Sequence, residues 1–462
     1  MLGDTIAAVS TPRGRGGVAV LRVSGAEAIE ICEKIFVARN GRRLSEQTPR
    51  MAIRGDIYAV RQGGERTCVD DGLVTVFRAP ASFTGEDTVE ISCHGGTLLT
   101  QTVLTSLLSC GARAAEAGEF TRRAFLGGKI GLSSAEALGN ILEAQTHAQL
   151  TLAHTGMRGR IEARCNEIYE KLRDILASIY AKIDYPDEDL ADMSREEMLS
   201  CLRECYAMTD ALLRTYKTGH AIAEGISTVI CGKPNVGKSS LYNRLLGREA
   251  AIVTDVEGTT RDVLTESISL GCVTLRLYDT AGLHETDNPV EQIGIARTRD
   301  ALDGAELIFA VFDGSRENDA EDIALAKDLQ DRKATVVAIV NKSDRRTVSD
   351  DFYASNFNHV VHVSAQTGEG MDALSRLVET LFTDDKIDLR GDAVLTNARQ
   401  HAAAYKAAEA LERAMETLVG GYPIELSCAD AEEAMTAISE LDGRAVSEDI
   451  VSQIFSHFCV GK

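Results

Sequence analysis

Two glycines, a lysine and a serine stand at a spacing that suits the phosphates of a nucleotide. The segment Gly232–Ser239 reads GKPNVGKS, which has the form G-x-x-x-x-G-K-S, and it lies between an apolar run at 228–231 and a helical pattern at 240–246. The glycines let backbone N–H groups converge on phosphate oxygens, and the helix N-terminus adds its dipole. We expect Lys238 to reach the β- and γ-phosphates and Ser239 to bind Mg²⁺.

The phosphate pattern does not choose between ATP and GTP, but three later motifs do. An apolar run at 275–278 ends in Asp279–Gly282 (DTAG), which offers a carboxylate to the metal and a glycine amide to the γ-phosphate. A second run at 336–340 ends in Asn341–Asp344 (NKSD), and a third at 360–363 leads into Ser364 and Ala365. A carboxylate at Asp344 can accept hydrogens from guanine N1 and its exocyclic amine, which adenine cannot offer. The motifs therefore predict guanine nucleotide.

The segment between the phosphate run and DTAG predicts a loop that responds to the nucleotide. Residues 252–262 read IVTDVEGTTRD, and a threonine hydroxyl there could complete the Mg²⁺ shell against the γ-phosphate. We choose Thr260 for that role, beside Ser239. The predicted GTP-contacting residues are Asn235, Val236, Gly237, Lys238, Ser239, Ser240, Thr254, Asp255, Val256, Glu257, Gly258, Thr259, Thr260, Asp279, Thr280, Ala281, Gly282, Asn341, Lys342, Asp344, Ser364 and Ala365.

The position after DTAG is unusual for a GTP hydrolase. Ras-like enzymes use a glutamine there to orient the attacking water, whereas this chain has Leu283, which can neither donate nor accept. Either the chain hydrolyses GTP poorly, as a GTP-binding scaffold, or another group acts on the water. The charged candidates for catalysis within these motifs are Lys238, Arg261 and Asp262.

Size and composition describe an ordinary globular protein of several domains. At 462 residues, and about 150 residues per domain, we expect about three domains. No apolar run is long enough for a membrane span and no export signal is apparent, so we predict a cytoplasmic protein. The net charge of −21 opposes nonspecific binding to nucleic acid, so contact with RNA would need a local basic patch or a basic partner.

The hydrophobic pattern predicts a multidomain α+β and α/β fold. Residues 1–120 alternate short strand patterns with glycine-rich turns, which indicates a small α+β domain. Residues 121–221 are helical, and in 222–383 strands alternate with helices, which indicates a parallel sheet. Helical spacing resumes over 384–462. The simplest arrangement is a Ras-like P-loop α/β domain inserted into a helical domain.

The nucleotide motifs resemble those of one particular family. The segments 232–240, 258–262 and 279–282 are similar to the MnmE (TrmE) family of tRNA-modification GTPases. The resemblance implies that Asn235 binds K⁺ together with Thr254 and the carbonyls of Val256 and Thr259. That ion supplies the positive charge of an arginine finger and is bound only when two G domains meet. The resemblance also assigns Glu291 to position the water.

The resemblance extends to both ends of the chain. Segments 4–8, 14–17 and 22–25 look like the opening of the family, 82–87, 94–96 and 118–125 look like its later signatures, and 458–462 (FCVGK) is close to its ending. It implies an N-terminal domain that binds a 5-formyl- or methylene-tetrahydrofolate donor at a dimer interface through Arg22, Glu90, Lys129 and Lys462. Cys459 would sit near the donor as a catalytic candidate, and whether it attacks or packs is open. Mild departures from the family are Ala117, Gly131, His284 and Val460.

The function implied by the resemblance is tRNA modification driven by GTP hydrolysis. The chain would form a homodimer and join the FAD-dependent protein MnmG in a heterotetramer. Together they would add a carboxymethylaminomethyl or aminomethyl group to carbon 5 of wobble uridine in certain tRNAs, with K⁺-dependent hydrolysis of GTP. The alternative is a regulatory GTPase switch in ribosome assembly without modification chemistry.

Overall fold

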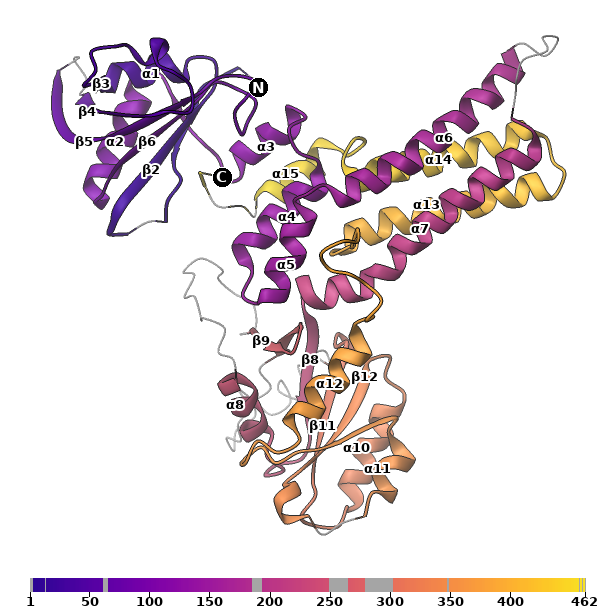
Figure 1. Cartoon of the computed structure of the whole chain (residues 1–462). Coiled ribbons are helices and arrows are strands. Elements are labelled where there is room, and N and C mark those ends of the chain that lie inside the picture. The colour runs from indigo at the N-terminus through magenta and orange to yellow at the C-terminus, as the bar shows by residue number, and fades with distance from the viewer. Residues whose placement is uncertain are drawn as a thin grey trace, which may run out of the picture. The chain divides into compact units, whose positions relative to one another are not determined.

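In a computed structural model of the chain, the residues described are 3–12, 14–60, 65–184, 193–248, 265–278, 302–346, 349–456, 458, 460 and 461. The chain forms two compact units (Figure 1). The first contains Met1–Gly139 and Ser439–Lys462, and the second contains Asn140–Ile438. The chain passes from the first to the second within α4 (Leu132–Glu143).

The first unit is built on a seven-stranded sheet with the order β3-β4-β5-β6-β2-β1-β7. Its strands pair antiparallel except for β1 and β7, which are parallel. The strands are β1 (Ile6–Val9), β2 (Gly16–Ser24), β3 (Phe36–Ala38), β4 (Ala52–Val60), β5 (Arg66–Phe77), β6 (Thr88–Gly95) and β7 (Arg113–Ala114).

One face of this sheet is covered by α1 (Ala28–Ile35) and α2 (Thr97–Ser109). Buried and less buried residues alternate along β6, and the buried ones, Val89, Ile91 and Cys93, belong to the core shared with these helices. The alternate residues Glu90, Ser92 and His94 are less buried and lie on the other face. A strand that alternates in this way has one face on the core and one face toward polar surroundings.

The end of the chain returns to the first unit. The short helices α3 (Glu119–Leu126) and α15 (Glu448–Ser456) belong to this unit. Phe125 and Phe455 lie with ring centroids 6.2 Å apart. Beyond α15, Val460 forms an isolated antiparallel bridge with Ala117, and the Ser10 hydroxyl donates to the carbonyl of Gly461 at 3.0 Å.

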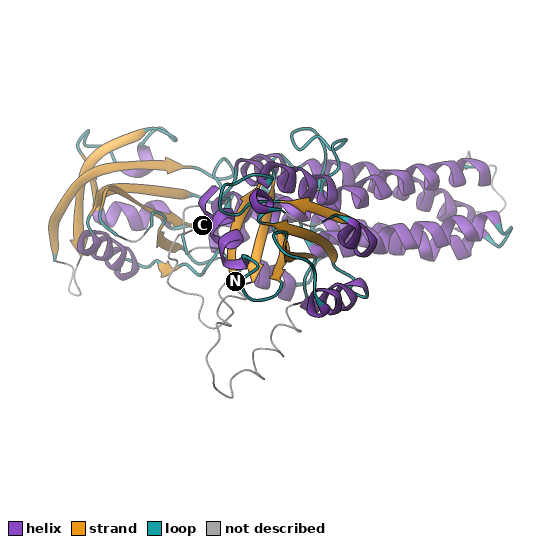
Figure 2. Cartoon of the chain, turned by 90° about the horizontal axis from the view of Figure 1, so that it is seen from below, coloured by secondary structure: helices purple, strands orange, loops and turns teal. Residues whose placement is uncertain are grey.

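The second unit contains a bundle of long helices. Figures 1 and 2 both show α6, α7, α13 and α14 side by side. A serine with a glutamate three residues later caps the start of α7, where Ser194 accepts from the N–H of Glu197 at 3.2 Å. The helices of this part are α5 (His147–Gly156), α6 (Arg160–Asp184), α7 (Arg195–Ala223), α13 (Ala398–Val419) and α14 (Ile424–Asp442).

Between α7 and α13 the second unit contains a six-stranded sheet of order β13-β12-β11-β8-β10-β9. All neighbours are parallel except β9, which is antiparallel to β10. Cores lie on both faces, one with α8 and α12 and the other with α10 and α11. The elements are β8 (Ile226–Cys231), α8 (Lys238–Arg248), β9 (Thr265–Leu270), β10 (Val273–Tyr278), β11 (Leu307–Asp313), α10 (Ala320–Gln330), β12 (Thr335–Asn341), α11 (Asp351–Asn356), β13 (His359–His362) and α12 (Met371–Phe382).

The architecture confirms the predicted fold class. An α+β unit, a helical bundle and an α/β sheet follow one another, and the α/β sheet lies in sequence between helices α7 and α13 that pack together. The four domain boundaries given above stay predictions. None of the described helices is both long enough and apolar enough for a bilayer span.

Candidate nucleotide site

The phosphate loop connects β8 to α8, and its two glycines are required by close approaches of other atoms. Gly232 has φ +146°, and a Cβ there would lie 2.4 Å from the carbonyl oxygen of Val311. Gly237 has φ +101°, and a Cβ would lie 2.1 Å from Nδ2 of Asn341. Asn235, between them, also adopts the left-handed region at φ +65°. Only glycine tolerates both the backbone conformation and the crowding found at positions 232 and 237.

The predicted phosphate ligands lie at the start of α8. Lys238 Nζ donates to the carbonyls of Gly232 at 2.9 Å and Lys233 at 2.8 Å, so its amine lies across the loop. Ser239 and Ser240 are exposed in the first turn of the helix. Free N–H groups and the positive end of the dipole meet at this terminus, which favours an anion.

Asn341 joins the phosphate loop to the predicted guanine loop. It ends β12 and is only 3% exposed. Its Nδ2 donates to the Val236 carbonyl at 2.8 Å, and its Oδ1 accepts from the Ala365 N–H at 3.0 Å. The amide therefore uses both ends to hold two loops that are more than 100 residues apart in sequence.

Lys342 adds a second connection. It adopts the left-handed region at φ +61°, and its Nζ donates to the Asn235 carbonyl at 3.1 Å and to Asp313 Oδ2 at 2.6 Å. Partial burial raises the pKa of the Asp313 carboxyl, but hydrogen bonds from Lys342 and Ser315 outweigh it and hold the pKa below its usual range. Asp313 is therefore ionised and fixes the lysine over the loop.

Asp344 stands where a base-reading carboxylate is expected. It belongs to the short 3₁₀ turn Ser343–Arg345, and its side chain is 25% exposed. The neighbouring loop is held by Arg244, whose Nε donates to the Ala365 carbonyl at 2.9 Å and whose Nη2 donates to Gln366. The structure thus brings the segments of Gly232–Ser240, Asn341–Asp344 and Ser364–Ala365 together at one end of the sheet.

The other predicted site residues fall on positions outside the described part of the chain, so their roles stay predictions. They are Thr254, Asp255, Val256, Glu257, Gly258, Thr259, Thr260, Arg261, Asp262, Asp279, Thr280, Ala281, Gly282, Glu291, Cys459 and Lys462.

Sequence reasoning missed three residues that position this site. Asp313 fixes Lys342, Arg244 holds the loop after Ser364, and Asp319 holds Lys233 in the phosphate loop by an ion pair. Asp313 ends a buried strand beside Gly314, which was a usable signal, because polar residues at the carboxyl ends of parallel strands gather at the ligand site. Arg244 and Asp319 carry no comparable signal.

In the first unit, Arg22 and Glu90 face each other on neighbouring strands. They are directly opposite in the β2–β6 register, and Arg22 Nη2 lies 2.8 Å from Glu90 Oε1. The guanidinium also lies 5.7 Å from the ring centroids of Phe83 and Phe120. Lys129 Nζ donates to the Pro80 carbonyl at 2.9 Å. The structure brings Arg22 and Glu90 together, and their role in binding a one-carbon donor stays a prediction.

Residues of the neighbouring signatures form an ionic network around the buried side chain of Arg123. Arg123, 4% exposed at its side chain, lies 2.9 Å from both Asp4 Oδ1 and Glu119 Oε1 and 3.1 Å from Glu86 Oε1. Burial raises the pKa of Glu119, but Arg113, the Glu116 N–H and Arg123 outweigh it and lower the pKa. These residues of segments 82–87 and 118–125 therefore hold the first unit together.

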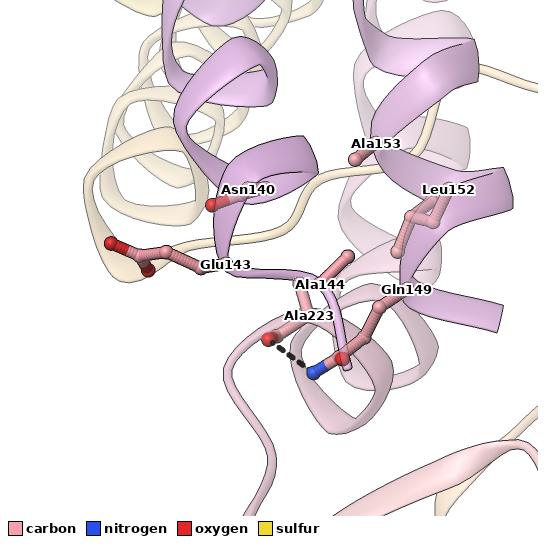
Figure 3. A pocket seen from close by; sticks show the side chains of 7 residues that line it. All are labelled: Asn140, Glu143, Ala144, Gln149, Leu152, Ala153 and Ala223. Atoms are coloured by element: carbon pink, nitrogen blue, oxygen red, sulfur yellow. Dashed lines mark hydrogen bonds between the residues drawn. The ribbon is translucent and has the colours of Figure 1, made fainter. Parts of the chain in front are cut away.

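A small cavity of about 40 Å³ lies in the second unit between the end of α4, α5 and the end of α7 (Figure 3). Gln149 Nε2 donates across it to the Ala223 carbonyl at 3.3 Å. A space of this size suits an ordered water rather than a nucleotide or folate.

Comparison with known proteins shows the family. A family model described as the MnmE helical domain matches residues 132–459, and one described as the GTP-binding protein TrmE N-terminus matches residues 5–129. A tRNA modification GTPase MnmE from Symbiobacterium thermophilum is 41% identical, covering 99% of both chains. The chain belongs to the MnmE family of tRNA modification GTPases. This confirms the family resemblance and the prediction of a GTP hydrolase.

Other members of the MnmE family match equally completely. The MnmE protein of Carboxydothermus hydrogenoformans is 39% identical over 100% of both chains, and that of Clostridioides difficile is 36% identical over 99% of both. A crystal structure of Aquifex aeolicus Era bound to GDP and AlF4− covers 40% of this chain and 65% of its own at 22% identity, with a TM-score of 0.28. A similarity that weak carries no argument.

Proposed function

We propose that the chain is a potassium-stimulated GTPase that modifies wobble uridine in tRNA together with an FAD-dependent partner of the MnmG type. One observation carries the proposal. A single buried amide, Asn341, holds the phosphate loop and the guanine loop in one site, on a chain that matches relatives named tRNA modification GTPase MnmE from end to end. GTP hydrolysis in this site would drive the modification.

The described residues fit GTP and Mg²⁺. The crowding at Gly232 and Gly237 leaves no room for side chains, so the loop backbone stays open to phosphate oxygens. Ser239 offers an exposed hydroxyl oxygen at the helix start, and Mg²⁺ prefers oxygen ligands. Bound Mg²⁺ would neutralise charge that develops on the phosphates, while Lys238 and the α8 N-terminus bind and orient them.

The potassium proposal rests on Asn235. Asn235 is exposed in the loop, three residues before α8, and its backbone adopts the left-handed region. An amide oxygen is a suitable ligand for a hard cation. We propose that Thr254, Val256 and Thr259 complete the ligand set when two G domains meet, that Thr260 joins Ser239 on Mg²⁺, and that Glu291 orients the attacking water.

The folate proposal rests on the pair of Arg22 and Glu90, which lies on the face of the first sheet away from the core with α1 and α2. Both hydrogen bonds from Arg22 go to Glu90 Oε1, so within the described residues Oε2 has no partner and can accept from an amino-pterin edge. Lys129 and Lys462 would bind carboxylates, with 5-formyl- or methylene-tetrahydrofolate as the donor. The hydrogen bond between Ser10 and Gly461 supports a chain end close to β1. We propose a homodimer that works in the cytoplasm, where its tRNA substrate is.

The direct test of the hydrolysis proposal is GTP turnover in KCl and in NaCl. We expect strong stimulation by K⁺, loss of that stimulation in Asn235→Ala, and low turnover in either salt for Glu291→Ala. Asn356→Ala, at the end of α11 and outside the loops of the site, is the matched control and should behave as the wild type. Equal turnover in the two salts would remove the potassium proposal, and negligible turnover in both would leave a GTP-binding scaffold.

The test of the modification proposal is mass analysis of wobble uridines in cells that lack the chain. Loss of the carbon-5 group, restored by the wild type and not by Glu291→Ala, is the expected result. Unchanged uridines would favour a regulatory switch in ribosome assembly instead.

A further inference from the structure

The first unit contains a hollow of about 500 Å³ beside the edge strand β3, and cations from three elements line it. Lys34 comes from the last turn of α1, Arg42 and Arg43 from the loop after β3, and Arg66 from the start of β5. Glu30 and Glu33 are the acidic residues of the lining. The hollow therefore has a positive balance.

Not all of this charge is neutralised by neighbours. The Glu33 carboxylate forms an ion pair with Arg43 Nη2 at 2.7 Å and accepts hydrogen bonds from the N–H and hydroxyl of Ser45. Lys34 faces Glu30 at 3.4 Å, a pair exposed on both sides and therefore weak. Within the described residues, Arg42 and Arg66 form no ion pair, although Arg66 lies 4.8 Å from the Tyr58 ring centroid. These two exposed arginines are available to a ligand.

Several lining residues of the hollow come from a basic stretch of an acidic chain. From Phe36 to Arg54 there are five arginines and a single acidic residue, Glu46, whereas the whole chain has a net charge of −21. Arg39 and Arg54 are paired with aspartates of β4 and β5, so among these arginines it is Arg42 and Arg43 that carry the charge of the hollow. The chain turns at Gly41, with φ +75°, and Arg42 and Arg43 follow this turn in the lining of the hollow. Among the described residues β3 is an edge strand of the sheet, and an edge strand presents backbone N–H groups outward.

We infer that this basic hollow, defined by Lys34, Arg42, Arg43 and Arg66, binds backbone phosphates of tRNA. Arginines and backbone N–H groups are the usual partners of nucleic-acid phosphates. A small patch of this kind gives a chain with a large negative charge a local point of attachment, and it leaves most of the affinity to a basic partner protein. The inference rests on the proposed function, which supplies the tRNA.

The test measures tRNA binding by the full chain in complex with its FAD-dependent partner between about 50 and about 250 mM salt. Arg42→Gln with Arg66→Gln should weaken binding about three- to tenfold and reduce the slope of log affinity against log salt by about 2, one for each phosphate that is no longer neutralised. Arg42→Lys with Arg66→Lys should keep the slope, because the attraction depends on charge. GTP turnover should be unchanged in both.

The matched control removes the same charge elsewhere. Arg164 and Arg173 on α6 are 45% and 56% exposed, and their change to Gln should leave the slope unchanged. The inference is overturned if the Arg42 and Arg66 variant has the slope of the wild type, or if it loses the partner protein instead of tRNA, which would make the hollow a protein interface. A wild-type complex that binds no tRNA at all would instead remove the proposed function itself.

Discussion

The nucleotide site and the first unit differ in what their charged and polar side chains bind. In the nucleotide site the side chains hold backbone, since Asn341 bonds Val236 and Ala365, and Lys342 bonds the Asn235 carbonyl. In the first unit the side chains bind one another, as Arg123 does with Asp4, Glu86 and Glu119.

This difference determines how far the function of each region can be predicted from the sequence. A loop that presents backbone N–H groups is formed by one contiguous segment, so its function can be predicted from the sequence of that segment. A cross-strand pair such as Arg22 and Glu90, 68 residues apart, depends on register. The first unit also contains two kinds of arginine, since the Arg123 side chain on α3 is 4% exposed and that of Arg22 on β2 is 21% exposed. Burial predicts a structural role for the first and leaves the second available to a ligand.

The largest expected effect is on the buried arginine. Arg123→Ala removes the cation that pairs with Glu86 and leaves Asp4 and Glu119 with Arg113 alone, and breaking a buried ion pair costs about 3–5 kcal/mol. Hydrogen exchange of β1 and α3 amides should report this loss. Arg122→Ala is the matched control, because its partner Glu448 is 86% exposed, and it should cost under about 1 kcal/mol. Equal costs for the two arginines would mean that the network is not structural.

The second expected effect is on nucleotide affinity. Asn341→Ala leaves the Val236 carbonyl and the Ala365 N–H without their partner in a buried place, which costs about 2–3 kcal/mol, or about 30- to 150-fold in affinity for GTP. Titration with a fluorescent guanine nucleotide measures it, with Asn356→Ala as the control in the same sheet domain. An affinity within about threefold of the wild type would show that something else joins the two loops.

The third effect concerns the attachment of the nucleotide-binding sheet to α7. His220 Nε2 lies 3.2 Å from Glu306 Oε1, and its Nδ1 lies 3.3 Å from Glu224 Oε2. The contact with Glu224 is an ion pair, but its geometry is not that of a hydrogen bond. Glu224 first, and then Glu306, raise the pKa of His220 to about 9. Glu306 also accepts from the Ser227 N–H at 2.9 Å, at the start of β8.

The raised pKa fixes the sign of the pH dependence. The folded pKa lies above the unfolded value of about 6.5, so the stabilisation is complete below about pH 6.5 and is lost as the pH rises through about 9. We expect His220→Gln to lower the free energy of unfolding by about 1–2 kcal/mol at about pH 6 and by little at about pH 10, measured in urea. His401→Gln is the control. Burial lowers the pKa of His401, so its replacement should not cost more free energy of unfolding at low pH than at high pH. A cost for His220→Gln that is equal at both pH values would contradict the ion pair.

Much of the fold and part of the site could be predicted from the sequence. The alternation of strands and helices predicted the inserted α/β domain, because parallel strands need crossover helices. The convergence of Gly232–Ser239 with Asn341–Asp344 was also predicted, because both runs follow buried strands whose carboxyl ends meet at one edge.

The remaining positioning residues could not be predicted for a physical reason. Arg123 lies in segment 118–125, which resembles a signature of the family. The sequence of that segment does not show that Arg123 is buried against Asp4, which is 119 residues away. The partnership depends on the pairing of β1 with β7 and on the packing of α3, and these are products of the whole unit. Arg244 likewise has no sequence signal, because its partner, the Ala365 carbonyl, is 121 residues away.

The smallest effect on stability, and the sharpest test of the comparison, is expected at Arg22. Its pair with Glu90 is partly exposed, so Arg22→Ala should change the free energy of unfolding by under about 1 kcal/mol. Binding of 5-formyl-tetrahydrofolate, measured by calorimetry, should fall more than about tenfold, because a cation that holds Glu90 in place is lost. Arg54→Ala removes an exposed pair with Asp71 in the same sheet and should change neither quantity. If Arg22→Ala left folate binding intact, the pair would be an ordinary cross-strand ion pair, and both regions would use their arginines for structure alone.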